Sequence, residues 1–274
     1  MSSESNTDPT AATEDLLVER SGPDDAIATL VLNRPESHNA IRLGMYQALP
    51  GVLAGIEADA SVKVLVVRGA GRKAFASGAD ISEFRQVRAN AQTAKAYNEH
   101  VAAAEQALEG LSKPTIAMVH GYCIGGGCGL ALACDLRFAD EQASFAITPA
   151  KLGLVYSLES TKRLVDVVGP AQAKWILMSG QRVNAARAHQ IGLADELVPA
   201  EDLEKLTHEF AELLCTRAQF SIRATKQIVT RILAGQTADD EQSRHLRNSS
   251  FDTDDYAEGV RAFLEKRRPQ FTWS

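Results

Sequence analysis

The chain has 274 residues, of which 45% are hydrophobic and 23% charged, and this ordinary globular composition excludes collagen-like and largely disordered proteins. Its length allows one large α/β domain or two small ones. With 29 basic and 35 acidic residues the formal charge is −6 and no dense basic stripe occurs, so we expect neither nucleic acid nor a membrane as partner.

Residues 1–13 are rich in Ser, Thr, Glu and Asp, and we expect a disordered tail there. This segment has no basic start and no apolar centre, so it does not have the pattern of a secretory signal. The four cysteines form no C-x-x-C pair, and we interpret them as reduced thiols of a cytoplasmic protein. We predict no metal site, because Cys and His do not cluster.

The first third of the chain predicts a hairpin, a helix and a buried strand. Residues 16–19 and 26–32 are β-prone on either side of a Gly-Pro-Asp-Asp turn, a pattern typical of a hairpin. The periodic segment 41–57 predicts a helix with a kink or break at Pro50. The apolar run 64–68 is typical of a strand that is buried on both faces.

The same alternation continues to about residue 147. A helix is predicted over 93–111, a strand over 115–119 and a short helix over 130–133. Short strands are predicted over 136–138 and 144–147. Strands that alternate with helices favour an α/β core.

Helices dominate the remainder of the chain. They are predicted over 164–168, 171–178, 185–190, 203–216, 221–233 and 254–267. We therefore predict an α/β core over residues 14–200 and a C-terminal helical region over residues 201–274.

Two loops of small residues each follow a predicted strand, over residues 73–81 and 120–129. Small residues let a ligand approach the backbone, and a glycine run that opens a helix presents free N–H groups at the positive end of the helix dipole. Two such groups directed at one oxygen form an oxyanion hole. The alternative is that both loops are only tight turns. A phosphate cradle is disfavoured, because no Gly-Lys-Ser/Thr follows the glycines.

Several short motifs follow one another in a defined order. They are Leu32-Asn33-Arg34-Pro35, Asn39-Ala40, Ala74 to Phe84, Lys113-Pro114, Gly121 to Gly127, Cys134 to Arg137, Leu152-Gly153, Thr161 to Leu164, Ala185 to Leu193 and Tyr256 to Arg267. In this order they resemble the crotonase (enoyl-CoA hydratase/isomerase) superfamily over nearly the whole chain. The resemblance implies a ClpP-like α/β spiral of ββα units with a C-terminal helical trimerisation region, assembled as a homotrimer or hexamer.

The resemblance also implies an acyl-CoA thioester as substrate, with coenzyme A entering as part of that substrate and no other cofactor. It assigns the oxyanion hole to the backbone N–H groups of Ala79 and Gly126. The CoA-binding positions that it implies are Ala76, Gly78, Ile81, Gly125, Phe263 and Lys266, the last two from a neighbouring subunit. For Lys266 the alternative is a solvated helix end.

The chain departs from the family pattern at two catalytic positions. The hydratases of the family carry glutamates at the positions that match Gly129 and Pro149. Glycine and proline transfer no proton, and general acid–base catalysis contributes about 10²–10⁴-fold. Ordinary hydration is therefore in doubt.

The pattern Thr148-Pro149-x-x-Leu152-Gly153-x-x-Tyr156 is similar to the methylmalonyl-CoA decarboxylase branch of the superfamily. Decarboxylation needs no base, because the departing CO₂ leaves an enolate that an oxyanion hole stabilises. Tyr156 would hydrogen-bond the carboxylate or protonate the enolate; alternatively it is an aromatic residue of the pocket wall. The decarboxylases of that branch differ by a histidine where this chain has Ala79.

Three hypotheses follow. Decarboxylation of a malonyl-type CoA is preferred, ahead of an enoyl-CoA hydratase or isomerase that uses a substitute acid such as Glu159, and of a non-catalytic acyl-CoA binding protein. Glu159 is alternatively a first-turn helix carboxylate. For Asp80 and Glu83 we favour helix capping or pairing with arginine over catalysis, and for His120 a structural role.

Overall fold

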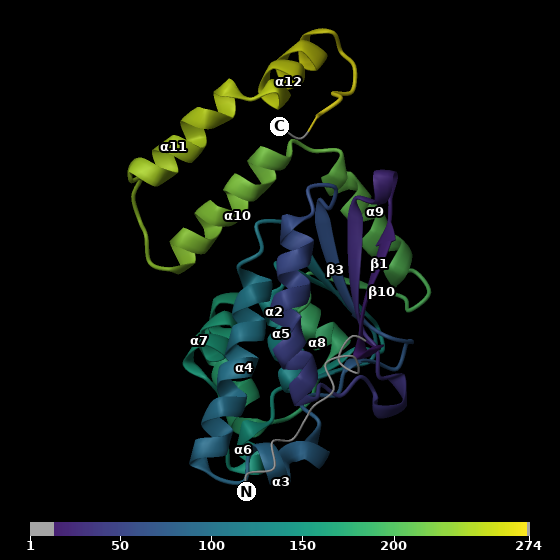
Figure 1. The fold of residues 1–274 in the computed structure, drawn as a ribbon, viewed down its shortest axis with the longest axis vertical. Coiled ribbons are helices and arrows are strands. Elements are labelled where there is room, and N and C mark those ends of the chain that lie inside the picture. The colour runs from purple at the N-terminus through teal and green to yellow at the C-terminus, as the bar shows by residue number, and fades with distance from the viewer. Residues whose placement is uncertain (1–13, 273–274) are drawn as a thin grey trace, which may run out of the picture.

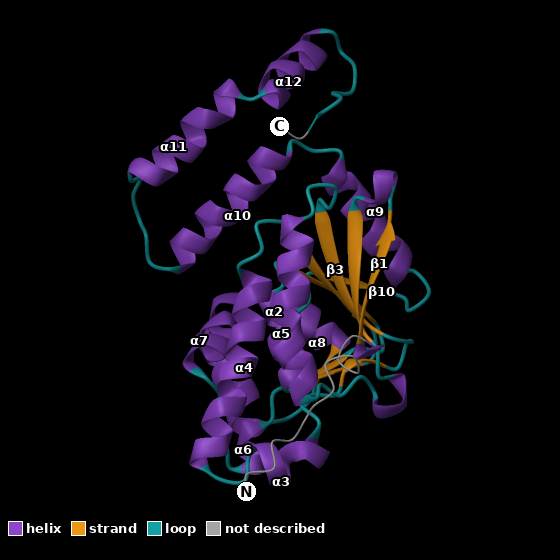
Figure 2. Cartoon of the chain, in the orientation of Figure 1, coloured by secondary structure: helices purple, strands orange, loops and turns teal. Residues whose placement is uncertain are grey.

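The computed structural model describes residues 14–272, so the predicted tail at residues 1–13 lies outside the described part. The strands form two sheets (Figure 2). The larger sheet has the order β1 (Leu16–Ser21), β2 (Ile27–Leu32), β3 (Val64–Gly69), β5 (Thr115–Val119), β7 (Leu136–Asp140) and β10 (Glu196–Val198). The smaller sheet has the order β4 (Ala74–Ala76), β6 (Tyr122–Ile124), β8 (Ser144–Ala146) and β9 (Val183–Asn184).

The chain winds through these sheets as a spiral. β3, β5 and β7 lie in the larger sheet, and each is followed by a strand of the smaller sheet, namely β4, β6 and β8. The pairs are parallel from β2 to β10, which suits the continuous apolar runs of these strands. The predicted N-terminal hairpin is confirmed, because β1 pairs with β2 in antiparallel register.

Helices cover both faces of the larger sheet (Figure 1). One face carries the main core, to which α2 (Leu43–Ala58), α4 (Ala91–Glu109), α5 (Gly126–Ala133), α7 (Leu158–Ser179) and α8 (Ala185–Gln190) contribute. The short helices α3 (Phe84–Val87) and α6 (Pro149–Leu152) lie beyond the ends of α4 and α7. Core packing of this kind fixes the helices that form the pocket described below.

The C-terminal helices divide into two groups. α9 (Leu203–Cys215) packs on the second face of the sheet, where Leu203 and Ala211 are buried against strand residues. In contrast, α10 (Gln219–Leu233), α11 (Glu241–Ser249) and α12 (Asp254–Leu264) project from the body as an arm (Figure 1). The predicted boundary at residue 200 therefore precedes a helix that packs on the core. None of the helices described has both the length and the apolar character needed to cross a bilayer.

The two helix interruptions predicted near prolines have different outcomes, because the break considered at Pro50 does not occur and the one next to Pro170 does. α2 continues through Pro50 as one helix, anchored by buried Tyr46, Leu49 and Leu53 on either side of it. The interruption predicted between residues 168 and 171 is confirmed, because α7 consists of two helical stretches joined across a kink at Gly169, which has φ +76° and ψ 163° and precedes Pro170. At Pro50, in contrast, burial of a helix face outweighs the loss of one hydrogen bond at a proline.

Candidate active site

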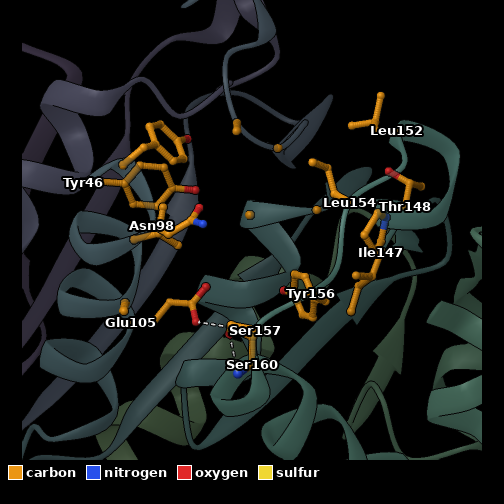
Figure 3. Close-up of a pocket in the computed structure, with 18 of the residues that line it drawn as sticks. Tyr46, Asn98, Glu105, Ile147, Thr148, Leu152, Leu154, Tyr156, Ser157 and Ser160 are labelled. Atoms are coloured by element: carbon orange, nitrogen blue, oxygen red, sulfur yellow. Dashed lines mark hydrogen bonds between the residues drawn. The ribbon is translucent and has the colours of Figure 1, made fainter. Parts of the chain in front are cut away.

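A pocket of about 260 Å³ lies between α4, the two small-residue bends and the start of α7. Figure 3 shows Tyr46 and Glu105 on one side of it, and Tyr156, Leu154 and Ile147 on the other. Much of the lining is apolar, and a few polar groups converge inside it, as is typical of a small-molecule site.

The first bend presents the N–H group of Ala79. The carbonyl of Gly78 accepts from the N–H of Ile41 at 2.8 Å, and the N–H of Asp80 donates to the carbonyl of Ile41 at 2.9 Å. Alternate backbone groups of an extended segment face opposite sides, so the N–H of Ala79 points away from Ile41. Ala79 is among the residues that line the pocket.

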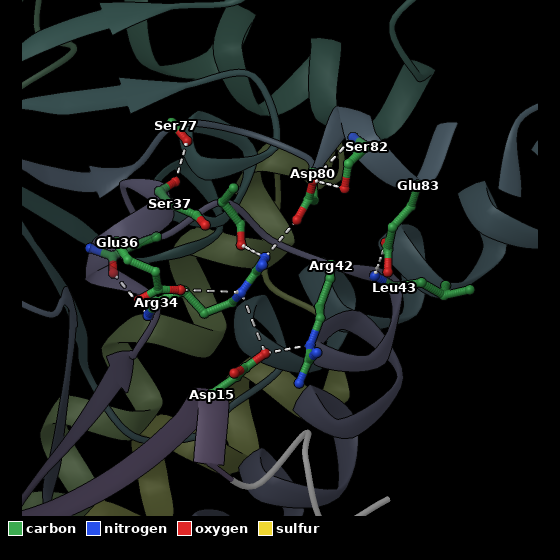
Figure 4. Close-up of polar contacts among 12 residues, drawn as sticks. Asp15, Arg34, Glu36, Ser37, Arg42, Leu43, Ser77, Asp80, Ser82 and Glu83 are labelled. Atoms are coloured by element: carbon green, nitrogen blue, oxygen red, sulfur yellow. Dashed lines mark hydrogen bonds and ion pairs between the residues drawn. The ribbon is translucent and has the colours of Figure 1, made fainter. Parts of the chain in front are cut away.

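A polar network holds this bend in place (Figure 4). Arg34 donates from Nη1 to Asp80 and to the carbonyl of Ala40, both at 2.8 Å. Asp80 also accepts from the N–H of Ser82 at 3.1 Å, and Glu83 accepts from the N–H of Leu43, at the start of α2, at 2.8 Å. These contacts agree with the capping and pairing roles predicted for the two carboxylates.

The second bend presents the N–H group of Gly126. Gly125 has φ +51° and ψ −115°, a conformation that favours glycine, and its own N–H donates to the carbonyl of Ala146 at 2.7 Å. α5 begins directly afterwards at Gly126. Its first N–H groups have no partner within the helix and lie at the positive end of the helix dipole.

The two bends approach each other closely. A Cβ atom on Gly78 would lie 3.1 Å from the carbonyl oxygen of Ile124, and one on Gly126 would lie 3.7 Å from the nitrogen of Ala79. Within residues 14–272, neither the Ala79 N–H nor the Gly126 N–H has a hydrogen-bond acceptor. Two free donors next to one pocket suit an oxygen on which negative charge develops.

A buried carboxylate also enters this pocket. Glu105 of α4 is 2% exposed, and its Oε2 accepts from Arg163 Nη1 at 2.6 Å and from Ser160 Oγ at 2.7 Å (Figure 3). A Cβ atom on Gly129 would collide with the other oxygen, Oε1, and would lie 3.1 Å from the Tyr156 hydroxyl. The Glu105 carboxyl group therefore fills the room beside Gly129, on the pocket side of α5.

The surroundings shift the proton affinity of both groups upwards. Burial raises the pKa of the Glu105 carboxyl, and the hydrogen bonds from Ser160 and Arg163 only partly oppose that effect. Burial also raises the pKa of the Tyr156 hydroxyl well above its usual value, and the nearby charge of Glu105 adds to this rise. Tyr156 is therefore protonated at neutral pH, and the Glu105 carboxyl holds its proton more strongly than an exposed glutamate does.

The structure brings most of the predicted site residues together. Ala79, Gly126, Tyr156 and Glu159 line one pocket. Glu159 is exposed at its mouth, in the first turn of α7.

The predicted CoA-binding positions divide into three groups. Gly78, Ile81 and Gly125 line the pocket. Ala76 is fully buried in β4, where its Cβ would lie 2.7 Å from a Cβ on Gly127, and among the described residues it is not part of the pocket wall. Phe263 and Lys266 lie on and just beyond α12, on the projecting arm and far from this pocket (Figure 1), so contacts from them require a neighbouring copy.

Reasoning from the sequence did not find Glu105. Its signal was present, because residues 97, 101, 104 and 108 form the apolar face of α4 and Glu105 falls on the same face. A carboxylate on the core face of an amphipathic helix is uncommon and indicates a partner or a role in chemistry. Its contact with Gly129, by contrast, depends on tertiary packing.

Two arginines of the pocket differ in their pairing. Arg163 donates to Glu105 and also to Glu109, at 2.7 Å from Nη2. Arg88 forms no ion pair within residues 14–272; its guanidinium carbon lies 4.7 Å from the Phe84 ring centre and 4.2 Å from that of Tyr97. The pocket wall therefore carries one cation without an anionic partner in the described chain.

His120 lies outside the pocket and has a structural partner. Its Nδ1 lies 2.7 Å from Asp140 Oδ2, and both side chains are buried. In the part of the chain that the structure describes, no group of His, Cys, Asp or Glu side chains is arranged to hold a metal ion.

Comparisons with known proteins place the chain among acyl-CoA enzymes. The family model described as enoyl-CoA hydratase/isomerase matches residues 22–273. A protein named probable enoyl-CoA hydratase from Mycobacterium bovis is 34% identical over 260 residues, covering 94% of this chain and 98% of that protein. A crotonyl-CoA hydratase from Syntrophomonas wolfei is 30% identical over 264 residues, covering 95% and 98%.

Solved structures agree with this placement. An enoyl-CoA hydratase/isomerase family protein from Hyphomonas neptunium superposes with a TM-score of 0.91 at 39% identity, covering 95% of this chain and 98% of the other. An enoyl-CoA hydratase/carnithine racemase from Magnetospirillum magneticum gives a TM-score of 0.90 at 35% identity, covering 96% and 97%. The likeness confirms the predicted α/β fold class, including its C-terminal helices.

Proposed function

The chain belongs to the enoyl-CoA hydratase/isomerase family, and from this premise we propose that it binds an acyl-CoA thioester and stabilises the thioester enolate between the N–H groups of Ala79 and Gly126. One observation supports this proposal most directly. The N–H groups of Ala79 and Gly126, one from each bend, border the same pocket, and neither has a hydrogen-bond acceptor in the described part of the chain. Each such donor contributes about 3–4 kcal/mol in known oxyanion holes.

For the reaction we propose hydration or double-bond isomerisation of an enoyl-CoA. The relatives named hydratases support this class, and so does the buried carboxylate of Glu105 inside the pocket. Glu105 reverses the order of preference derived from the sequence, in which the lack of glutamates at 129 and 149 favoured decarboxylation. The Glu105 carboxylate would repel the carboxylate of a malonyl-type substrate, whereas it could exchange a proton with an enoyl-CoA. Its presence in the pocket therefore favours proton transfer over decarboxylation.

Decarboxylation of a malonyl-type CoA is the second candidate. Arg88 supports it, because its guanidinium group is an unpaired cation of the pocket wall, within the described chain, to which a substrate carboxylate would bind. Tyr156 supports it as well, since its protonated hydroxyl lies in the pocket and is available to protonate an enolate. The third candidate is a protein that binds acyl-CoA without converting it.

The proposal extends to the assembly. Coenzyme A enters as part of the substrate along Gly78, Ile81 and Gly125, and Phe263 and Lys266 of a neighbouring copy complete its contacts. We propose a homotrimer or hexamer formed through the arm, whose helices expose apolar side chains. These are Ile228, Val229, Ile232, Leu233, Phe251, Val260, Phe263 and Leu264. We also propose a cytoplasmic location.

A substrate panel tests the reaction. The wild-type protein is incubated with crotonyl-CoA, a 3-enoyl-CoA, malonyl-CoA and methylmalonyl-CoA, and the products are identified by mass spectrometry. Addition of water or a shift of the double bond supports the first candidate, and loss of CO₂ supports the second. Binding of acyl-CoA without turnover of any member contradicts the proposal of an enzyme.

A variant pair tests the oxyanion hole. A Cβ atom on Gly126 would collide with the Tyr46 hydroxyl and lie 3.7 Å from the Ala79 nitrogen. The double variant Gly126→Ala/Tyr46→Phe removes that collision and leaves a methyl group at the hole. Relative to Tyr46→Phe alone, we expect kcat to fall about 10²–10³-fold with the melting temperature little changed. Equal rates for the two variants contradict the assignment.

A further inference from the structure

Two positions on different helices share one space in the pocket. The hydratase pattern places its first glutamate at position 129, where this chain has glycine, and the Oε1 atom of Glu105 occupies the point at which a side chain on residue 129 would begin. Glu105 belongs to α4, whereas Gly129 belongs to α5. In place of a glutamate at position 129 of α5, the chain therefore has the carboxylate of Glu105 from α4 in the same space.

We infer that Glu105 is the acid/base group of the active site, reaching in from α4 through the space that Gly129 leaves open. This inference rests on the proposed function, because it names the group that moves the proton in that reaction. Glu105 and Tyr156 meet beside Gly129, and both line the pocket that Ala79 and Gly126 border.

The contacts of Glu105 leave one oxygen for chemistry. Arg163 and Ser160 both donate to Oε2, at 2.6 and 2.7 Å, and thereby fix the orientation of the carboxyl group. Within the described residues, no hydrogen-bond donor contacts Oε1, which faces Gly129. Oε2 thus fixes the orientation of the carboxyl group, and Oε1 remains available to exchange a proton.

One such group suffices for the proposed reactions. In hydration, the oxygen of water bonds to Cβ, the electron pair of the double bond passes into the enolate, and Glu105 accepts a proton from that water. Glu105 then returns the proton to Cα as the enolate collapses. In isomerisation, it takes a proton from one carbon and returns it to another. The N–H groups of Ala79 and Gly126 hold the thioester oxygen throughout.

Glu159 is a weaker candidate for this role. It lines the same pocket but is exposed at the mouth. Glu105 is 2% exposed, and burial shifts its pKa upwards from the usual glutamate value. A general acid/base works best when its pKa lies close to the operating pH.

The first experiment compares Glu105→Gln with Glu109→Gln. Both glutamates bind Arg163, but Glu109 does not line the pocket, so it is the matched control. We measure hydration of crotonyl-CoA and the exchange of the α-protons of butyryl-CoA in D₂O, which requires only a base and an oxyanion hole. We expect Glu105→Gln to lose about 10²–10⁴-fold in both assays, and Glu109→Gln to keep most of its rate.

The second experiment moves the carboxylate. In Glu105→Ala/Gly129→Glu the glutamate returns to α5 and the space it needs is vacated on α4. We expect this double variant to recover part of the activity that Glu105→Ala loses. In Gly129→Glu alone the new side chain competes with Glu105 for the same space, so we expect its rate to fall below that of the wild type. A merely structural role of Glu105 predicts no recovery.

The outcomes separate the two proposals. A wild-type protein that is inert in both assays overturns the proposed function and this inference together. An active wild type with an equally active Glu105→Gln overturns only the assignment of Glu105. If Glu105→Gln does not fold, Glu105→Asp decides: a lower rate with a displaced pH–rate limb supports the assignment, and an unchanged rate and limb overturn it.

Discussion

Glu105 in the pocket and Glu258 in the projecting arm are both bound by arginine, yet their pKa values move in opposite directions. Arg163 and Ser160 donate to Glu105, but burial in the core dominates and raises the pKa of its carboxyl. Glu258 accepts from Arg261, from Arg267 at 2.6 Å and from the N–H of Gln270 at 2.8 Å.

At Glu258 the donors dominate instead. The hydrogen bond from Arg267 contributes most, and together the donors lower the pKa of the Glu258 carboxyl well below its usual range. Glu258 belongs to α12, which lies on the projecting arm and away from the core (Figure 1). Contact with arginine therefore does not decide whether a glutamate holds its proton; the balance between donors and desolvation does.

We expect the largest difference between the two glutamates when the arginine partner of each is removed. Arg163→Met leaves the Glu105 charge inside the core with one donor fewer, and such losses cost about 3–5 kcal/mol. Arg267→Met on the arm leaves Glu258 with Arg261 and the N–H of Gln270 as donors, so we expect little change in global stability. Urea denaturation of both variants measures the difference, and equal losses would mean that burial is not the distinguishing factor.

The pH dependence of folding stability gives a second, smaller difference between Glu105 and Glu258. Because the folded-state pKa of Glu105 is raised, its contribution to stability is fully present below the usual glutamate pKa and is lost as the pH rises through the folded value. We therefore expect the melting temperature of the wild type, relative to that of Glu105→Gln, to fall as the pH rises. A flat or rising difference would contradict the raised pKa.

At Glu258 we expect the smallest effect, and the pH dependence of its contribution to stability has the opposite sign to that of Glu105. Its lowered pKa means that its contribution is present above the usual glutamate pKa and is lost as the pH falls through the folded value. We expect Glu258→Gln to speed hydrogen exchange at Gln270, whose N–H donates to this carboxylate, with core amides unaffected. Unchanged exchange at Gln270 would show that the contact does not hold the end of the arm.

The sequence predicted most of the spiral because its signals are local. The strand predicted at 115–119 and the helix at 185–190 coincide with β5 and α8. The two predicted loops, 73–81 and 120–129, contain the bends but also the short strands β4 and β6, which were not predicted. α11 was missed, because residues 241–249 are mostly polar and carry no apolar period. The break considered at Pro50 does not occur, since the buried face of α2 holds the helix together.

The candidate site was predictable only in part, for a related reason. The N–H groups of Ala79 and Gly126 belong to bends whose small residues are visible in the sequence. Glu105 shares the pocket with residues from α5 and α7 that are 21 or more positions away along the chain. No local pattern encodes such a meeting, and only the packing of α4 against α5 reveals it.

The overlap of Glu105 Oε1 with the side-chain position of Gly129 couples these two positions. A side chain on residue 129 would require the Glu105 carboxyl group to move from its present place, where Arg163 and Ser160 hold it. A carboxyl group can therefore reach this point of the pocket from either of two helices, and a substitution at one of the two positions is expected to change which residues the other tolerates.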